Sequence, residues 1–470
     1  MPVFSLPSPY GIGTMGKHAY EFADYAASCG AKIWQVLPLG PTGYGDSPYQ
    51  SFSSFAGNPY FIDPDFLVRD GLLKKADLPK KLPEGNKINY GEIYLTRGEM
   101  LRRAFAYSWD KVSGDAKRFA GEHPEIMDYA LFMTAKTING GVCWHDFPEE
   151  LMLHEKNAVK ELGEKHADEV NYHIYTQYLF FSQWKALKKY VNSLGMELLG
   201  DMPIYVAPDS ADAWANPENF QFDQRRNPSL VAGVPPDYFS EDGQKWGNPL
   251  YDWDYIKNDG YSFWIRRVKA AAELYDAVRI DHFIGFANYY SVKAECPTAR
   301  EGFWRDGPGI ELFDKIKKEV PRIRLIAEDL GVVSDKVITL LKQTGYPSMR
   351  VLQFAFGGED DNMHLPSNVP QNSVVYTSTH DNVPTCGWWE NTSQKEKAEV
   401  ARRLGKESPK MPDDLIRCAL DCRAETVIIP MWDILGLGME ATVNAPGTAE
   451  GNWCWRLDKI PQSSIDISRK

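Results

Sequence analysis

The sequence predicts an α/β fold of the (β/α)8 barrel type, with subdomains inserted between strands and no separate C-terminal β-domain. Three observations predict it: strand-like apolar segments alternate with amphipathic helices, eight such strands can be counted, and acidic residues follow several of them. The expected strands are residues 32–38, 59–62, 197–204, 276–283, 323–328, 349–356, 373–379 and 425–431. Because one barrel with insertions can exceed 400 residues, residues 1–470 are expected to form a single catalytic barrel.

The N-terminal part of the chain begins the alternation. The turn-rich segment Leu6–Gly13 leads into an amphipathic helix near residues 17–29, and Gly30 is expected to end that helix because glycine readily adopts the left-handed conformation. Residues 32–38 follow as a buried strand, and residues 59–62 as a short second strand. This order is typical of an α/β protein.

Two stretches interrupt the alternation, and we expect each to be an insertion. Residues 64–165 contain charged helical segments and are too long for a simple connection, which predicts a mainly helical subdomain. A periodic helix at 172–194 then restores the pattern. Residues 207–260 are rich in Pro, Asp, Asn and aromatic residues and show neither a helical nor a strand period. They predict an irregular loop subdomain that covers the active-site groove.

Composition limits the possible partners. The chain carries 64 acidic and 52 basic residues, a net charge of −12, which argues against nucleic acid or an anionic membrane as partner and suits a neutral ligand. Aromatic residues make up 13% of the chain. Most of them are expected in the core, and the others could form platforms for the apolar faces of sugars.

Cysteine usage and the absence of export signals predict a cytoplasmic protein. Seven cysteines are an odd number without framework spacing, so no disulfide scaffold is expected. Cys418 and Cys422 lie four residues apart but lack nearby partners for a zinc site, and no metal or other cofactor is expected. No apolar run of 18 residues and no signal pattern is present, although a removed transit peptide would allow a plastid location.

Acidic residues stand at the ends of four predicted strands: Asp201, Asp281, Glu328 and Asp381. A single Asp after a strand is more often a helix N-cap than a catalytic group. Four such residues weaken that explanation, because barrel enzymes gather their chemistry at the C-terminal ends of several strands. The sequence therefore predicts one site at that end of the barrel.

The strand at 277–283 gives the strongest signal. Its alternation sends Val278 and Ile280 to one face and Arg279 and Asp281 to the other. A buried Arg–Asp pair without a task would be costly, since each charge must lose its water. At His380 and Asp381 the alternation is less regular, so a bend must be assumed there.

Several carboxyl groups without a clear set of metal ligands indicate glycoside cleavage, in which one carboxylate attacks the anomeric carbon and a protonated carboxyl serves the leaving oxygen. Arg279 should hold Asp281 ionised, because a nearby positive charge lowers a carboxyl pKa. The apolar residues before Glu328 and the neighbouring Asp329 should favour the protonated form of Glu328. A metal site using His282 and His380 is a weaker alternative; both are interpreted as hydrogen-bonding partners, and His282 is equally well explained as structural.

Nine short motifs are spread nearly end to end along the chain: Leu6–Gly13, Ser47–Phe52, Gly57–Tyr60, Gly200–Pro203, Val231–Asp237, Trp246–Tyr251, Arg279–Phe283, Ala327–Gly331 and Thr379–Asn382. Through these motifs, in this order, the chain resembles the amylomaltases, or 4-α-glucanotransferases, family 77 of the glycoside hydrolases. The resemblance implies a barrel with inserted subdomains and a retaining mechanism. It implies that Asp281 is the nucleophile, Glu328 the acid/base and Asp381 the stabiliser of the transition state.

The same resemblance implies the residues that hold the sugars. Arg279 and His380 would contact the reactive sugar and the nucleophile, and Asp201 would close the same subsite. Tyr49 would form the stacking platform under that sugar, while Trp246 and Asn248 lie in the loop that covers acceptor sugars in relatives. The implied partners are α-1,4-glucan donors and acceptors such as maltooligosaccharides.

Two other functions fit the same residues. An α-1,4-glucan hydrolase of the amylase type would use the same three acids, because the acids alone do not identify the acceptor. A catalytically inactive barrel could bind glucan for scaffolding or regulation, although the complete set of acids argues against it. A transferase that moves α-1,4-glucan segments between chains is the favoured hypothesis.

Overall fold

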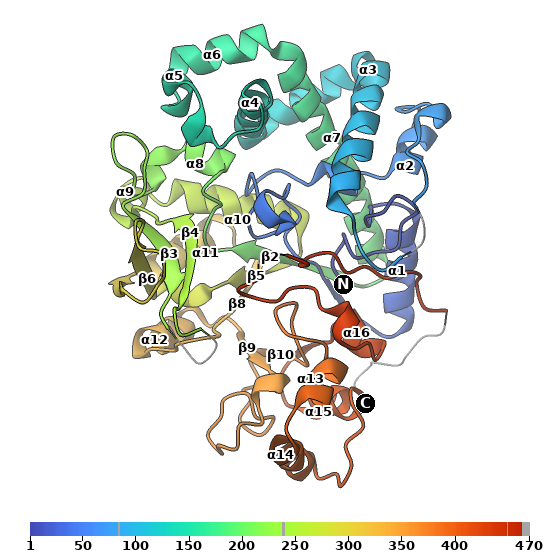
Figure 1. The fold of residues 1–470 in the computed structure, drawn as a ribbon, viewed down its shortest axis with the longest axis vertical. Coiled ribbons are helices and arrows are strands. Elements are labelled where there is room, and N and C mark those ends of the chain that lie inside the picture. Colours follow the sequence, from blue (N-terminus) through green and yellow to red (C-terminus); the bar gives the residue numbers. More distant parts are fainter. Residues whose placement is uncertain (83–84, 237–239, 449, 463–470) are drawn as a thin grey trace.

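The structure is a computed structural model, and it describes residues 1–82, 85–236, 240–448 and 450–462. Asp237, the last residue of one family motif, lies outside these residues. The N-terminus lies near the middle of the molecule in Figure 1.

A parallel sheet of seven strands forms the centre of the described structure. Its order is β1 (Ile33–Gln35), β2 (Glu197–Pro203), β5 (Ala277–Asp281), β8 (Arg324–Ala327), β9 (Ser348–Val351), β10 (Ser373–Tyr376) and β11 (Thr426–Ile428). Every neighbouring pair in this order is parallel, as expected for a barrel built from β/α units. The α/β barrel architecture is confirmed, and seven of the expected strands are present.

The expected strand at residues 59–62 is wrong. Residues Pro59–Phe61 form a short 3-10 helix, η2, because Pro59 occupies its first turn and the Asn58 side chain accepts a hydrogen bond from the Tyr60 amide. A proline with a preceding cap favours a helical turn over a strand. Among the described residues the sheet therefore has two ends, β1 and β11.

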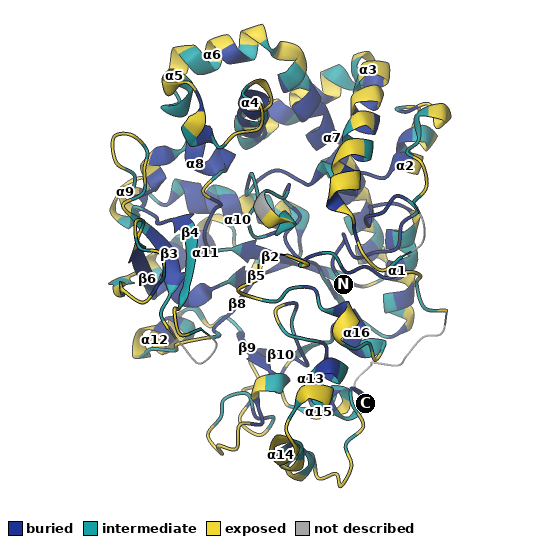
Figure 2. Ribbon diagram, in the orientation of Figure 1, coloured by how far each residue is buried: buried dark blue, intermediate teal, exposed yellow. Residues whose placement is uncertain are grey.

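Helices that lie before and between these strands in the chain pack around the sheet. The helices of this layer are α1 (Lys17–Ser28), α7 (Ala167–Ser193), α10 (Ser262–Leu274), α11 (Ile310–Glu319), α12 (Asp335–Thr344) and α15 (Asp413–Asp421). All of these helices except α15 contribute apolar residues to one large core, which contains Trp184 of α7 and Val268 of α10. Leu415 and Ala419 of α15 belong to a second core, which also contains Val375 of β10. Figure 2 shows the resulting pattern, with dark buried faces inside and yellow exposed faces outside.

Residues 64–165 are mainly helical, in line with the expected character of this stretch. The helices are α2 (Pro64–Arg69), α3 (Tyr90–Glu122), α4 (Pro124–Ile138), α5 (Glu149–Met152) and α6 (Lys156–Lys165). Helices α3 and α4 pack against α7, and the group lies at the top of the molecule in Figure 1. That these residues form a separate inserted subdomain stays a prediction.

Residues 207–260 are more regular than the sequence indicated. They contain α8 (Ala211–Ala215), β3 (Leu230–Val234), β4 (Gln244–Pro249) and α9 (Trp253–Asn258). The two strands join β6 (Asn288–Lys293) and β7 (Gly302–Asp306) in an antiparallel sheet of order β4-β3-β6-β7. A register shift within β3 and the Gly, Asn and Pro residues of β4 hide the strand pattern, which only the pairing with β6 reveals.

The C-terminal third carries three further short or medium helices, at the bottom of the molecule in Figure 1. They are α13 (Thr385–Asn391), α14 (Gln394–Leu404) and α16 (Met431–Ile434). None of the helices formed by the described residues combines the length and the apolar character needed to cross a membrane.

Candidate active site

Three neighbouring strands bring their polar ends to one place. In the register of β2 and β5, Asp201 lies beside Arg279 and Pro203 beside Asp281. Glu328 directly follows β8, where Ala327 lies beside Ile280. The parallel register therefore places Asp201, Asp281 and Glu328 at the same edge of the sheet, as the sequence predicted for the strand ends.

Arg279 joins two of these carboxylates. Its Nη2 donates to Asp201 Oδ2 at 2.7 Å and to Asp281 Oδ1 at 2.9 Å, and its Nε donates to Asp201 Oδ2 at 3.0 Å. Nη2 also lies 3.3 Å from the Tyr49 hydroxyl, which itself donates to Asp201 Oδ2 at 2.8 Å. Arg279 and Asp201 are both buried, so each charge depends on the other for compensation. This network fixes the position of Asp281.

Glu328 is held by the backbone. Its Oε2 accepts from the His282 amide at 2.7 Å and its Oε1 accepts from the Leu330 amide at 2.7 Å. His282 has a left-handed conformation with φ of 52° at the turn after β5, and this turn aims its amide at Glu328. Burial and then the charge of Asp281 raise the pKa of Glu328 to about 8. A carboxyl group that keeps its proton at neutral pH can act as an acid catalyst.

The prediction that Asp329 favours the protonated form of Glu328 is wrong. Asp329 accepts two hydrogen bonds from Arg350 Nη1, at 3.0 and 2.9 Å, and one from the Met349 amide at 2.7 Å. Asp329 thus forms a buried ion pair with Arg350. The acid whose charge opposes ionisation of Glu328 is Asp281, which the fold brings from another strand.

Asp281 is less deeply buried than Glu328. Its side chain is 29% exposed, whereas Glu328 is 7% exposed. Burial raises the pKa of Asp281 to about 7, and the positive charge of Arg279 opposes this rise. The expected influence of Arg279 therefore has the right direction, but burial outweighs it. Arg279 donates a hydrogen bond directly to Asp281, which favours ionisation of Asp281 over that of Glu328.

Asp381 stands at a bend after β10. The Asn382 side chain accepts from the Thr379 amide at 3.0 Å and its own amide donates to the Thr379 carbonyl at 3.2 Å, which closes the bend that the sequence required. Asp381 is 46% exposed, and its Oδ1 accepts from Asn444 Nδ2 at 2.6 Å. Asp381 Oδ2 lies 3.3 Å from His380 Nε2. The bend thus turns Asp381 toward solvent while His380 stays buried.

Tyr49 and His380 form an aromatic floor. Their rings are 5.3 Å apart and nearly parallel, with an angle of 13° between them. Trp453 lies 5.7 Å from the Tyr49 ring, centroid to centroid. Flat, closely packed rings of this kind can support the apolar face of a sugar.

A cavity of about 390 Å³ opens over these residues. Five of the predicted site residues line it: Tyr49, Trp246, Asn248, Asp281 and Asp381. The other four, namely Asp201, Arg279, Glu328 and His380, are bonded to or packed against this wall and lie behind it. The strand β4 supplies one side of the cavity, with Trp246 edge-on to His282 at 4.8 Å.

The side-chain NH2 group of Asn248 already makes a hydrogen bond within the protein. Its Nδ2 donates to the Val206 carbonyl at 2.8 Å, so the side chain holds β4 against the segment after β2. Its predicted contact with a sugar would then use its oxygen.

Sequence reasoning did not identify several residues of the cavity. Gln244, Tyr205, Asn444, Asn452 and Trp453 also line it. Trp453 has a left-handed φ of 61°, which is unusual for a bulky side chain and indicates a fixed position. No strand end or local spacing identifies these residues, because Gln244 belongs to the unexpected strand β4 and the other four lie on loops after β2 and near the C-terminus.

The described residues contain no group of three or more His, Cys, Asp or Glu side chains placed to hold a metal ion. The polar groups of the cavity are instead carboxyls, amides and aromatic rings. Such a set can donate and accept protons and can stack on a neutral polyol.

Comparison with known proteins gives a consistent result. A sequence model of the 4-alpha-glucanotransferase family matches residues 1–462. A 4-alpha-glucanotransferase from Thermus thermophilus is 46% identical over 466 residues, which cover 96% of this chain and 93% of the relative. A chloroplastic/amyloplastic 4-alpha-glucanotransferase from Solanum tuberosum is 42% identical over 465 residues, which cover 96% of this chain and 80% of the relative.

A solved structure agrees with these sequence comparisons. An amylomaltase from Streptococcus agalactiae, in complex with acarbose, has a TM-score of 0.94 to this fold at 36% identity. The match covers 97% of this chain and 94% of that chain. The similarity therefore extends over the barrel and both long stretches between its strands.

Proposed function

The chain belongs to the 4-alpha-glucanotransferase family, and from this premise we propose that it transfers α-1,4-glucan segments by double displacement, with Asp281 as the covalent carrier. The transferase function follows from the family, whereas the roles of individual residues are our proposal. The observation that supports these roles best is the pair of neighbouring strand-end acids, Asp281 bonded to Arg279 and Glu328 kept protonated by burial.

In the first step Glu328 donates its proton to the glycosidic oxygen while an Asp281 oxygen attacks the anomeric carbon. The C–O bond to the leaving chain breaks as the ester bond to Asp281 forms, and the leaving chain departs with a new hydroxyl group. Arg279 keeps Asp281 in position for attack through the 2.9 Å hydrogen bond. Retention requires the two carboxyl groups to be about 5 Å apart, without room for a water between them.

In the second step the 4-hydroxyl of an acceptor chain gives its proton to Glu328 and attacks the anomeric carbon of the ester. The C–O bond to Asp281 breaks, and Asp281 leaves as a carboxylate. Asp381, partly exposed and bonded to Asn444, would stabilise positive charge on the sugar ring in both transition states.

The acceptor would lie along β4 and the loop that carries Trp453. Trp246 and Gln244 form one wall of the cavity and Trp453 lies near Tyr49 on another. Aromatic walls that hold a sugar hydroxyl over the ester would favour transfer over attack by water, because positioning raises effective concentration. Residues 207–260 would thus form the groove-covering insertion, with Asn248 and Trp246 as its sugar contacts.

Maltotriose provides the test of this proposal. Incubation should yield glucose and a ladder of longer maltodextrins while the total number of reducing ends stays constant. A rise in reducing ends would show hydrolysis instead. No change in either quantity would contradict both enzymatic functions and favour a barrel that only binds glucan.

We also propose a cytoplasmic or plastid compartment. All seven cysteines are free, including Cys418 and Cys422, which suits a reducing environment. The Solanum tuberosum relative is named chloroplastic/amyloplastic. Fractionation of source cells with an antibody to this chain would test the location, and recovery from the medium or a membrane fraction would contradict it.

A further inference from the structure

Asp433 is a buried carboxylate that the proposed mechanism does not use. It belongs to the short helix α16, is 0% exposed, and does not line the catalytic cavity. Its Oδ2 accepts hydrogen bonds from the hydroxyl groups of Thr377 at 2.6 Å, Ser378 at 2.8 Å and Thr385 at 2.8 Å. Its Oδ1 accepts from the Thr385 amide at 2.8 Å. These four bonds replace the water that a buried carboxylate loses.

The donors stand at the two ends of one loop. Strand β10 ends at Tyr376 and helix α13 begins at Thr385, and Asp381 lies between them. We call residues 377–385 the Asp381 loop. Because Asp433 binds donors at both ends, one side chain closes this loop at its base.

The donors require an ionised carboxylate. The Ser378 hydroxyl oxygen accepts from Trp432 Nε1 at 3.2 Å, so its own proton is directed to Asp433. The Thr385 amide can only donate. An asparagine at position 433 would turn its NH2 group either toward this amide or toward the three hydroxyl groups. In either orientation at least one hydrogen bond to the loop would be lost.

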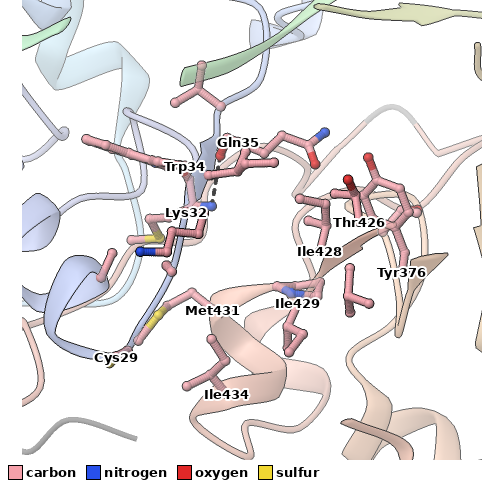
Figure 3. A pocket seen from close by; sticks show the side chains of 18 of the residues that line it. Cys29, Lys32, Trp34, Gln35, Tyr376, Thr426, Ile428, Ile429, Met431 and Ile434 are labelled. Atoms are coloured by element: carbon pink, nitrogen blue, oxygen red, sulfur yellow. Dashed lines mark hydrogen bonds between the residues drawn. The ribbon is translucent and has the colours of Figure 1, made fainter. Parts of the chain in front are cut away.

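The start of the Asp381 loop borders the cavity of about 440 Å³ between β1 and β11. Residues 378–380 line this cavity, and Figure 3 shows Tyr376, the last residue of β10, together with Met431 and Ile434 of α16 around it. Side chains that border a cavity have fewer packing contacts. The hydrogen bonds to Asp433 therefore contribute more to the position of the loop than they would in a fully packed region.

The position of Asp381 follows from the loop backbone. The Asp381 amide donates to the Thr379 hydroxyl at 3.2 Å. The Asp381 side chain is 46% exposed, with Oδ1 bonded to Asn444 at 2.6 Å. A side chain this exposed takes much of its position from the backbone that carries it. A shift of about 1 Å in a group that acts on the transition state can cost ~10²-fold in rate.

We propose that Asp433 is a positioning residue that holds Asp381 where it stabilises positive charge on the sugar ring. It does so by tying Thr377 and Ser378 to Thr385 across the base of the Asp381 loop. This inference rests on the role of Asp381 in the proposed function. Because Asp381 acts on the transition state, loss of these bonds should lower kcat and leave KM nearly unchanged.

Asp433→Asn provides the first test, with Asp63→Asn as its matched control. Asp63 is also buried, and its carboxylate accepts from the Thr14 hydroxyl at 2.6 Å and from the Phe66 amide at 3.0 Å at the start of α2. We expect both variants to lower the Tm, because each loses a buried hydrogen bond. Only Asp433→Asn should lower kcat for maltotriose, by ~10²-fold, with KM changed less than ~3-fold. Equal kcat in the two variants, or a loss confined to KM, would overturn the proposal.

A double-mutant cycle shows whether Asp433 acts through Asp381. In an Asp381→Asn background, Asp433→Asn should reduce kcat by less than ~3-fold further. A further loss of ~10²-fold would mean that Asp433 supports a different group and would overturn the proposal. Wild-type kcat in Asp381→Asn alone would overturn the role of Asp381 in the proposed function, and this inference with it. A large loss in Asp381→Asn beside unchanged kcat in Asp433→Asn would overturn this inference alone.

Thr385→Val provides a second test that does not depend on the folding of Asp433→Asn. Valine has the shape of threonine and keeps the backbone amide, so only the hydroxyl bond to Asp433 is lost. Thr134→Val is the control, since Thr134 is equally buried and its hydroxyl donates to the Ala130 carbonyl within α4. We expect only Thr385→Val to lower kcat, by ~10-fold and with KM unchanged. Equal kcat in both valine variants would contradict the proposal.

Discussion

The centre and the ends of the parallel sheet show opposite solutions to burial. The central strands β2 and β5 carry Asp201, Arg279 and Asp281, and both carboxylates accept hydrogen bonds from the arginine. The end strands β1 and β11 are less well buried: Ile33 and Gln35 of β1 and all three residues of β11 are only partly buried. Charge is stable in the centre because each charged group has a partner. Among the described residues each end strand pairs with one strand of this sheet, and its residues are less completely covered. The residues that contact a side chain, more than its own polarity, therefore decide whether that side chain can be buried in a strand.

Asp281→Asn should have the largest effect, because it removes the proposed nucleophile. We expect maltotriose disproportionation to fall by ~10⁴-fold or more, with little change in far-UV circular dichroism. The measurement is the initial rate of glucose release. Unimpaired turnover would exclude Asp281 as the carrier.

Glu328→Gln should reduce the same rate by about 10²- to 10⁴-fold, because the leaving oxygen no longer receives a proton. A donor with a leaving group that needs no proton, such as α-maltosyl fluoride, should restore the first step. Mass spectrometry should then detect the ester on Asp281. Equal loss with both donors would argue against an acid role for Glu328.

The stability of the protein should depend on pH through Glu328. Burial raises its pKa in the folded state from 4.5 to about 8, so between these values the folded state binds a proton that the unfolded state has lost. Stability from this group is therefore full below pH 4.5 and declines as the pH rises toward 8. Urea unfolding of wild type and Glu328→Gln should show a stability advantage of the variant that grows from pH 5 to pH 8. A constant difference across this range would contradict the raised pKa.

The smallest effect should come from a matched pair of valines. Val278→Ala in the central strand β5 removes a side chain that is 0% exposed and should lower the free energy of unfolding by about 2–3 kcal/mol. Val427→Ala in the end strand β11 removes a partly buried one and should cost less than about 1 kcal/mol. Chemical denaturation of both variants measures the difference. Equal losses would mean that β11 is as well packed as the centre.

Much of the candidate site could be predicted from sequence because strand ends in a barrel converge. The alternation around Arg279 and Asp281 and the acids after three other strands identified the groups that the structure joins. The local environment was harder to predict. The short strand expected at residues 59–62 is a helical turn, since the capping by Asn58 outweighs the apolar pattern. The strands β3 and β4 were not expected, because their pairing with distant residues compensates for weak local signals.

The sequence by itself determined the barrel class, the family, and the positions of Asp281, Glu328 and Asp381 at strand ends, because side-chain alternation and element order are local properties of the chain. Only the tertiary structure decided which acid raises the pKa of Glu328, since Asp329 pairs with Arg350 and Asp281 comes from another strand. Only the tertiary structure revealed the cavity of about 440 Å³ between β1 and β11, two strands almost 400 residues apart in the chain. Charge interactions and the packing of distant strands depend on distances in space. The separation of two residues along the chain does not give these distances.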